Sequence, residues 1–209
     1  VKTGEIAFDN RFGESAWEYY AKNPEDAAVF NDAMTGLTEM VNAAVIPAYD
    51  FSGLKKVIDI GGGHGALMTG ILKANPSVQG AVFDLPHVTE GSAARMASAG
   101  VGDRCDITSG DFFAEVPAGY DAYVMKFIIH DWDDEKSIAI MKNIRRAMAD
   151  GGRLLLVEQI VSADNAPSFA KFIDVNMLVM TGGRERTEQE FADLFAASGF
   201  RLTRVVPTE

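Results

Sequence analysis

The fold is decided by the stretch VIDIGGGHG at residues 57–65. Val57, Ile58 and Ile60 surround one acid, Asp59, and a short apolar run of this kind is typical of a buried parallel strand. A glycine cluster follows, and the next segment, residues 66–73, has the apolar spacing of a helix. Glycines allow positive φ angles and let a ligand approach the backbone closely. The stretch therefore predicts the strand, turn and helix that open a nucleotide-binding type of α/β fold.

The glycine cluster fits more than one cofactor. Gly61, Gly63 and Ala66 match the dinucleotide pattern Gly-x-Gly-x-x-Gly/Ala. Asp59, Gly61, Gly63 and Gly65 match Asp-x-Gly-x-Gly-x-Gly, which resembles the first motif of S-adenosylmethionine-dependent methyltransferases. A tight turn that binds no ligand is the third interpretation. The rest of the chain has to decide between them.

Composition limits the class of protein. A chain of 209 residues with 47% hydrophobic and 23% charged residues suits one globular α/β domain. Its net charge of −11 argues against nucleic acid as a partner, because phosphate binding needs a basic surface. No apolar run approaches the roughly 18 residues of a membrane span, so we expect no membrane partner. The single Cys105 fits a reducing cytoplasm and, with only three histidines, argues against a structural zinc site.

Strands and helices alternate along most of the chain. Continuous apolar strands joined by helices imply a parallel sheet that is covered on both faces. Asp133 and Thr187 are predicted to cap helices, the second through a capping box with Glu190. The predicted strands are 57–60, 78–83, 105–109, 122–128, 153–157 and 200–206, and the predicted helices are 14–22, 25–46, 66–73, 87–99, 134–148, 168–180 and 188–198.

Polar residues follow the carboxyl ends of these strands, which is where open parallel sheets bind ligands. Asp84 ends the second strand, about 20 residues after the glycines, and an acid there can accept hydrogen bonds from ribose hydroxyls. Asp111 ends the third strand beside Phe112, a pair that suits an adenine amine and ring. The alternatives are a helix-capping acid for Asp84, and a turn acid beside a core aromatic for Asp111.

Five further motifs make the resemblance specific. In order and spacing the chain resembles the small-molecule O-methyltransferases of the caffeate and plant phenol type, whose motifs are shared by bacterial polyketide O-methyltransferases. The motifs are FDLPHV (83–88), GDFF (110–113), KFIIHDWDDE (126–135), GGRLLLVEQIV (151–161) and TGGRERTEQEF (181–191). The resemblance covers nearly the whole chain. It implies a Rossmann-like, doubly wound, mostly parallel sheet with helices on both faces, the class I methyltransferase fold, which binds S-adenosylmethionine without a metal.

The resemblance also implies which residues form the site. The cofactor-binding residues that the resemblance implies are Gly61, Gly63, Asp84, Leu85, Asp111, Phe112 and Lys126. The leading segment FNDAMTGLT (30–38) is similar to the family segment in which the positions of Met34 and Thr38 line the cofactor or substrate pocket. On the helix 168–180, the family lines its acceptor pocket, which implies Asn176, Met177 and Met180 as substrate-binding residues. Core packing is the alternative for the apolar stripe of that helix, Phe169, Phe172, Ile173, Met177 and Met180.

His130 is the implied catalytic base. A phenol has a pKa of about 10 and a free histidine about 6.5, so full ionisation of the phenol by histidine costs about 5 kcal/mol. We therefore expect proton removal as the methyl group moves, aided by precise placement and by carboxylates that raise the basicity of His130. The resemblance assigns that supporting role to Glu158 and Glu185, for which surface or structural acids are the alternative. A capping or core histidine is the alternative for His130.

An acidic run follows His130, namely Asp131, Asp133, Asp134 and Glu135. Such a run can be interpreted as a magnesium site. We prefer a helix N-terminus, whose dipole favours acids, and the resemblance to a metal-free family agrees.

Two parts of the family pattern are absent from these 209 residues. The family carries an N-terminal winged-helix-like dimerisation domain, and a seventh strand that runs antiparallel between strands five and six. We therefore expect residues 1–50 to be a leading helical segment and residues 51–209 the S-adenosylmethionine-binding catalytic domain of a longer, homodimeric protein. Alone, these residues would bind cofactor but turn over poorly.

The leading functional hypothesis is methyl transfer to a hydroxyl of an aromatic or polyketide-like small molecule of secondary metabolism. An S-adenosylmethionine-binding relative with hydroxylase-like or decarboxylase-like chemistry is a second hypothesis. A nicotinamide-dependent oxidoreductase and a non-catalytic binding module are further alternatives. The acceptor itself is not predicted.

Overall fold

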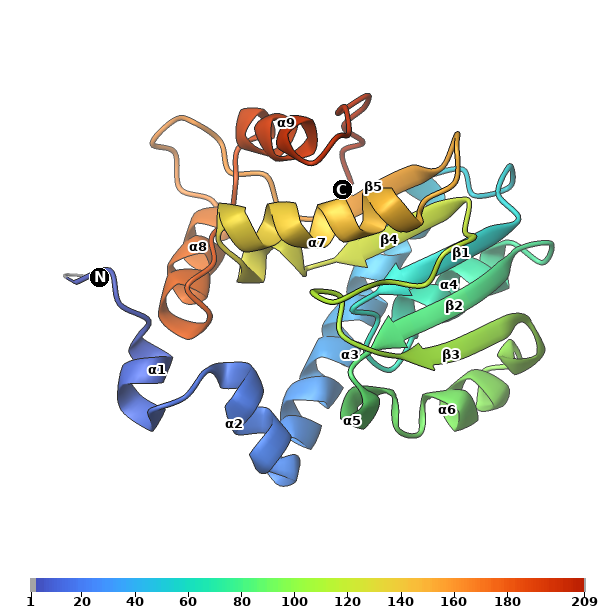
Figure 1. Ribbon diagram of the computed structural model, residues 1–209, viewed down its shortest axis with the longest axis horizontal. Coiled ribbons are helices and arrows are strands. Elements are labelled where there is room, and N and C mark those ends of the chain that lie inside the picture. Colours follow the sequence, from blue (N-terminus) through green and yellow to red (C-terminus); the bar gives the residue numbers. More distant parts are fainter. Residues whose placement is uncertain (1–2, 209) are drawn as a thin grey trace.

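The core of the computed structural model, which describes residues 3–208, is a sheet of five parallel strands in the order β3-β2-β1-β4-β5. The chain places β1 in the middle, adds β2 and β3 on one side and returns to add β4 and β5 on the other (Figure 1). The order reverses between β1 and β4, and this switch point is where such sheets bind ligands. The strands are β1 Lys56–Ile60, β2 Gln79–Asp84, β3 Cys105–Ser109, β4 Ala122–Lys126 and β5 Arg153–Val157.

Helices cover both faces of the sheet, which confirms the doubly wound α/β fold. On one face, Ile58, Tyr123 and Met125 of the strands form a core with α7 and α9. On the other face, Val57 and Val82 pack with α3, α4 and α6. The helices are α1 Ala7–Phe12, α2 Ala16–Lys22, α3 Pro24–Ala48, α4 Ala66–Ala74, α5 Pro86–Thr89, α6 Ser92–Ser98, α7 Asp134–Ala147, α8 Phe169–Met180 and α9 Glu188–Ala197, with 3₁₀ turns η1 Gly102–Arg104 and η2 Ile129–Asp131.

The predicted caps are confirmed. The side chain of Asp133 accepts a hydrogen bond from the backbone N–H of Lys136 at the start of α7. Thr187 and Glu190 form the reciprocal capping box of α9. These caps fix where α7 and α9 begin, and both beginnings lie beside the sheet edge that carries the polar residues.

Two predicted elements differ in the structure. The helix predicted over 87–99 is two helices, α5 and α6, because Gly91 takes a left-handed φ of 80° and caps α6. The strand predicted over 200–206 does not form, and this segment runs without a strand partner in the part of the chain that is described.

The prediction that α3 buries one apolar face is wrong for its first half. In this half Val29 is 71% exposed and only Ala27 is buried. Farther along, Met40 is 76% exposed, whereas Thr38 and Val45 are buried. The second half of α3 packs on α4, where Asn42 Nδ2 donates to the carbonyl of Ala66 at 2.9 Å. The first half extends past the carboxyl edge of the sheet, beside α2 (Figure 1). Over residues 3–208, no helix combines the length and apolarity that a membrane crossing needs.

Candidate functional site

Five strands end in candidate site residues at one edge of the sheet. Gly61 follows β1, Asp84 ends β2, Asp111 lies just beyond β3, Lys126 ends β4 and Glu158 follows β5. Because all five strands are parallel, their carboxyl ends meet at this edge. The arrangement is the one that the sequence predicts.

The glycine loop after β1 adopts backbone conformations that favour glycine. Gly61, Gly63 and Gly65 have φ angles of 70°, 57° and 80°. A Cβ on Gly61 would lie 2.5 Å from Ile128 Cδ1, whereas a Cβ on Gly63 would meet no atom within 4 Å. The loop is thus packed against the protein at Gly61 and open at Gly63, where a ligand can approach the backbone.

Asp84 is bound to this loop. Its Oδ2 accepts a hydrogen bond from the N–H of Gly63 at 2.8 Å, and its Oδ1 accepts one from the N–H of Leu85 at 2.7 Å. Burial raises the pKa of Asp84, although the two backbone hydrogen bonds act in the opposite direction. Each carboxylate oxygen has a second lone pair, so Asp84 retains acceptor capacity for two ligand hydroxyls. It caps no helix through its side chain, since α5 begins without such a cap.

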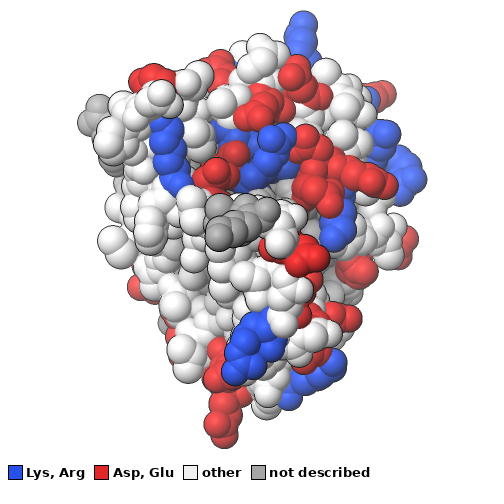
Figure 2. Space-filling view, turned by 90° about the vertical axis from the view of Figure 1, so that its left-hand side faces the viewer, with Lys and Arg blue, Asp and Glu red and all other residues white. Residues whose placement is uncertain are grey.

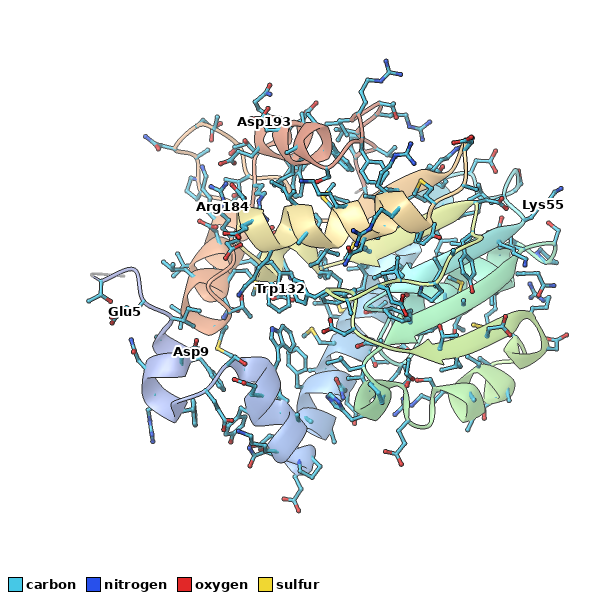
Figure 3. The ribbon with its side chains drawn as sticks, in the orientation of Figure 1. Glu5, Asp9, Lys55, Trp132, Arg184 and Asp193 are labelled. Atoms are coloured by element: carbon cyan, nitrogen blue, oxygen red, sulfur yellow. The ribbon has the colours of Figure 1, made fainter. Side chains whose placement is uncertain are left out.

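Asp111 makes the hydrogen bond of a turn acid. Its Oδ1 accepts from the N–H of Phe113 at 2.8 Å. The neighbouring Phe112 and Phe113 both meet the Trp132 ring edge-on, with centroids 6.2 and 4.8 Å away. Trp132 also lies 6.1 Å from Trp17 of α2, and Figure 3 shows it pointing from the start of α7 toward that helix. Aromatic side chains therefore surround the end of β3, and the adenine role of Asp111 and Phe112 stays a prediction.

Lys126 and Asp59 lie under the edge between β1 and β4. Asp59 is 2% exposed, and burial raises its pKa to about 7 despite the favourable charge of Lys126. Burial lowers the pKa of Lys126, against the charges of Asp59, Glu158 and Asp131. The Lys126 ammonium lies 4.3 Å from the centroid of the Phe127 ring. Asp59 and Lys126 thus interact electrostatically with charged groups on both sides of the switch point, with Asp84 on one side and with Glu158 and Asp131 on the other.

His130 lies in the turn η2 and is enclosed by carboxylates. Its Nδ1 is 2.8 Å from Glu185 Oε1 and 3.8 Å from Glu158 Oε2, and its Nε2 is 3.9 Å from Asp131 Oδ1. His130 is 8% exposed, and the side chains of Glu158 and Glu185 are 3% and 0% exposed. The alternative of surface acids is therefore wrong for both glutamates, and the structure brings the three predicted residues together.

The backbone that leads into His130 is held in an unusual conformation. Phe127 has a φ of 55°, which costs energy for a residue with a Cβ, and its ring stacks on the His130 ring at 5.5 Å. Glu158 Oε1 accepts hydrogen bonds from the N–H groups of Ile128 and Ile129 at 3.1 and 2.8 Å. Glu158 thus anchors the turn that carries His130.

The charged groups in this cluster shift one another's pKa values. Burial alone lowers the pKa of His130, but the hydrogen bond that its ring donates to Glu185 and the charges of Glu158 and Asp131 outweigh burial and raise the pKa to about 9. Burial raises the pKa of Asp131 to about 7 and also raises the pKa of Glu158, although the charge of His130 opposes both shifts. His130 is consequently a stronger base than a free histidine, with Nδ1 hydrogen-bonded to Glu185 and Nε2 beyond hydrogen-bond distance of Asp131 Oδ1, at 3.9 Å.

The same cluster has the donor set of a cation site. His130, Glu158 and Glu185 offer one nitrogen and two carboxylate oxygens within 4.8 Å of one another. A divalent cation there would displace the hydrogen bond between His130 Nδ1 and Glu185 Oε1. The metal-free prediction is therefore open to a direct test by chelation.

Sequence reasoning missed two parts of this site. Asp131 was assigned to the helix N-terminus, but α7 begins at Asp134, and Asp131 is buried in η2 beside His130. Arg186 was assigned no role, yet it is completely buried directly after Glu185. No periodicity could have revealed the burial of either residue. The adjacency of Arg186 to Glu185, and of Asp131 to His130, was the available signal.

The candidate acceptor residues are on α8 and α3. Asn176 is exposed, and Met177 and Met180 are half-buried, as is Met34 on α3. Phe169 and Phe172 are 66% and 68% exposed, so the core interpretation of the α8 stripe is wrong. Helix α8 lies away from the sheet and next to α1 (Figure 1). On the face shown in Figure 2, acidic and basic side chains are interspersed and do not form a basic patch.

A cavity of about 650 Å³ lies elsewhere, along β5 between α9 and the segment 199–208. Its wall combines side chains of β5, α3, α4 and α9 with the segment 199–208; of the predicted site residues the lining includes Glu158, but not His130 or Asp84. The segment predicted as the sixth strand, residues 200–206, forms part of its wall. The cavity is therefore not assigned to the site.

Comparison with known proteins gives consistent results. Residues 1–201 match the model of the O-methyltransferase domain family. The chain is 52% identical over 208 residues to phenazine O-methyltransferase PhzM of Lysobacter antibioticus, covering 100% of this chain and 61% of that protein. A crystal structure of LaPhzM superposes with a TM-score of 0.97 at 52% identity, covering 100% of this chain and 63% of the other. The neocarzinostatin-biosynthesis O-methyltransferase NcsB1, in complex with S-adenosyl-L-homocysteine and 1,4-dihydroxy-2-naphthoic acid, superposes with a TM-score of 0.91 at 32% identity, covering 99% of this chain and 62% of the other.

Proposed function

Because this chain belongs to the O-methyltransferase family, we propose that its protein transfers a methyl group from S-adenosylmethionine to a hydroxyl of an aromatic small molecule, with His130 as general base. Residues 51–209 are the catalytic domain in this proposal, and residues 1–50 are a leading helical segment. The observation that carries the proposal is the buried hydrogen bond between His130 Nδ1 and Glu185 Oε1 at 2.8 Å. It orients the ring, strengthens the base and directs Nε2 toward the acceptor.

The edge formed by β1, β2 and β3 fits the cofactor. Asp84 would accept the ribose hydroxyls, the open backbone at Gly63 would lie against the ligand, and Asp111 with Phe112 would hold the adenine. Gly61, Leu85 and Lys126 complete the proposed binding set. S-adenosylmethionine supplies an electrophilic methyl group on a sulfonium.

His130 performs the proton transfer in this proposal. The neutral imidazole donates its Nδ1 hydrogen to Glu185 and accepts the hydroxyl proton of the acceptor at Nε2, which leaves an imidazolium. The charges of Glu158 and Asp131 stabilise that imidazolium, as the raised pKa of about 9 for His130 indicates. The acceptor oxygen then needs no full ionisation before it attacks, and the step costs less than it would with a free histidine.

The surroundings of His130 also favour a neutral acceptor. Three carboxylates lie within 4 Å of its ring nitrogens, so a negative group beside the reacting hydroxyl would be repelled. Met34, Met177 and Met180 would supply adaptable apolar contacts, and Asn176 a polar one. PhzM acts on a phenazine, and we propose an aromatic or polyketide-like hydroxyl compound of secondary metabolism as the acceptor class here.

We further infer a homodimer in the full-length protein and a cytoplasmic location. Exposed apolar side chains on α3, among them Val29 and Met40, support a covered surface in the assembly. Light scattering of the full-length protein tests the dimer, since a monomer would contradict it.

The direct test is transfer of a labelled methyl group from S-adenosylmethionine to hydroxyphenazine or hydroxynaphthalene acceptors, with His130→Ala. We expect this variant to lose about 10²- to 10⁴-fold in kcat and to bind S-adenosylhomocysteine as the unsubstituted protein does. His87→Gln, an exposed histidine on α5, is the matched control and should keep its rate.

Full activity of His130→Ala would refute the base assignment. Binding of NADH instead of S-adenosylhomocysteine would favour the oxidoreductase alternative. Cofactor binding without methyl transfer to any acceptor would favour the hydroxylase-like or decarboxylase-like alternative. Retention of activity after treatment with a chelator is the expected result for chemistry without a metal.

A further inference from the structure

Arg186 is a completely buried arginine that the proposed chemistry does not use. It is the largest of the fully buried side chains and directly follows Glu185 in the sequence. A buried charge is costly unless it is paired and fully hydrogen-bonded, so its presence beside the base needs a physical reason.

The partners of its guanidinium supply that reason. Nε and Nη2 donate to Asp134 Oδ1 at 3.0 and 2.8 Å. Nη2 also donates to the carbonyl of Trp132 at 2.7 Å. Nη1 donates to the carbonyls of Ile129 and Arg184 at 3.0 and 3.3 Å. All three guanidinium nitrogens thus have acceptors, and two of these acceptors are backbone carbonyls of the turn that carries His130.

These two carbonyls stand on either side of His130. Ile129 directly precedes His130, and Trp132 follows it by two residues, where η2 gives way to α7. Asp134, the third partner, is the first residue of α7. Arg186 therefore fixes the backbone before and after the base and joins it to the helix that follows.

The segment 183–186 holds the base in two further ways. A Cβ on Gly183 would lie 2.0 Å from the carbonyl oxygen of His130, so the two backbones are in close contact. Glu185, from the same segment, accepts the hydrogen bond of the His130 ring. A shift of this segment would therefore move the ring partner and the backbone of the base relative to each other.

We propose that Arg186 is a positioning residue that fixes His130 in register with Glu185 by clamping the backbone on both sides of the base. The proposal rests on the function of His130 proposed above. Only a planar, forked donor reaches both carbonyls and the Asp134 carboxylate at once, whereas the single ammonium of lysine is a point donor. Catalytic geometry is sensitive to displacements of about 1 Å, which cost on the order of 100-fold in rate.

The test is Arg186→Lys in the full-length protein, with kcat measured across pH. We expect kcat to fall about 10- to 100-fold and the dissociation constant of S-adenosylhomocysteine, measured by calorimetry, to change less than about twofold. The rising limb of the pH–kcat profile should shift to lower pH, because a looser contact with Glu185 weakens the base. A merely structural role would lower the amount of folded enzyme without moving that limb.

Arg184→Lys is the matched control. The Arg184 side chain is 42% exposed and bonds the same aspartate, with Nη2 2.7 Å from Asp134 Oδ2. Within residues 3–208 this side chain makes no hydrogen bond to the turn around His130. The backbone N–H of Arg184 donates to the carbonyl of His130 at 2.9 Å, and the substitution leaves that bond in place. We expect its kcat and pH profile to stay within about twofold of the unsubstituted protein, the usual scale of an exposed ion pair.

A folded Arg186→Lys with unchanged kcat and pH profile would overturn the proposal. If Arg186→Lys does not fold, Asp134→Asn provides the test. This substitution removes the charge of the half-exposed carboxylate that accepts hydrogen bonds from Arg186. There we expect the same shift of the pH limb with a loss of about threefold, and no change would overturn the proposal. Activity in His130→Ala would refute the base itself, whereas inactivity there with unchanged Arg186→Lys and Asp134→Asn would refute only the clamp.

Discussion

The two sides of the switch point build their parts of the site in different ways. After β1 and β2, the site consists of the glycine backbone and of Asp84, whose carboxylate accepts hydrogen bonds from two backbone N–H groups. After β4 and β5, it is made of buried charged side chains, with His130 among three carboxylates. Backbone geometry needs little desolvation of charge, whereas a buried charge cluster depends on every partner. We therefore expect substitutions to affect ligand affinity on the first side and rate on the second.

The largest effect on ligand affinity is expected for a substitution on the cofactor side. Asp84→Ala removes the proposed acceptor of two ribose hydroxyls, and hydrogen bonds to charged groups contribute about 1.5–3 kcal/mol each. It also leaves the N–H groups of Gly63 and Leu85 without their acceptor. We expect the dissociation constant of S-adenosylhomocysteine, measured by calorimetry, to rise at least about 100-fold. The kcat at saturating cofactor should fall much less.

Asp106→Ala is the control for that experiment, since Asp106 is an exposed aspartate on β3. It should bind the cofactor product normally. Unchanged affinity in Asp84→Ala would contradict the assignment of the cofactor side. An equal effect in both variants would mean that overall charge, rather than this carboxylate, controls binding.

The second prediction concerns the charge cluster. Glu185→Gln keeps a side chain of the same shape but removes the charge that helps to raise the pKa of His130 to about 9. His130 accepts a proton only when neutral, so the rate of the unsubstituted protein should rise with pH until about 9. With glutamine the pKa is lower, and the rising limb of the pH–rate profile moves to lower pH. The plateau should be about 10- to 100-fold lower because the base is weaker and less well oriented.

Glu188→Gln, an exposed glutamate at the start of α9, is the control for this profile. It should leave both the limb and the plateau in place. A limb that moves to higher pH in Glu185→Gln would show that another group titrates there. The affinity for S-adenosylhomocysteine should not change in either variant, which separates the two sides of the site.

The comparison also explains what the sequence could predict. The glycine loop, the strand-end acids and the caps at Asp133 and Thr187 are local features, because a few adjacent residues determine each of them. All five observed strands were predicted within two residues of each observed end, and the strands over 105–109 and 153–157 matched at both ends. Family motifs supplied His130, Glu158 and Glu185, which lie far apart in the chain and meet only in the fold.

Long-range features were not predictable in the same way. The burial of Arg186 depends on carbonyls more than 50 residues away, such as those of Ile129 and Trp132. The exposure of α8 and of the first half of α3 depends on what packs against them, and apolar spacing alone assigned both to the core. The segment 200–206 has a strand-like composition, but a strand needs a partner. The spacing of apolar residues shows which face of a helix is apolar, but only the tertiary structure shows whether another element covers that face.

The smallest predicted effect is on stability, and it tests the difference between an exposed and a buried apolar face. Phe172 of α8 is 68% exposed, and alanine is a better helix former than phenylalanine, so Phe172→Ala should change the free energy of unfolding by less than about 0.5 kcal/mol. Phe191 of α9 is 5% exposed and belongs to the core, so Phe191→Ala should cost about 3–5 kcal/mol. Urea unfolding of both variants measures the contrast. A loss above about 1 kcal/mol in Phe172→Ala would mean that another surface covers α8 in solution, and the stripe would then be a buried interface and not part of an acceptor pocket.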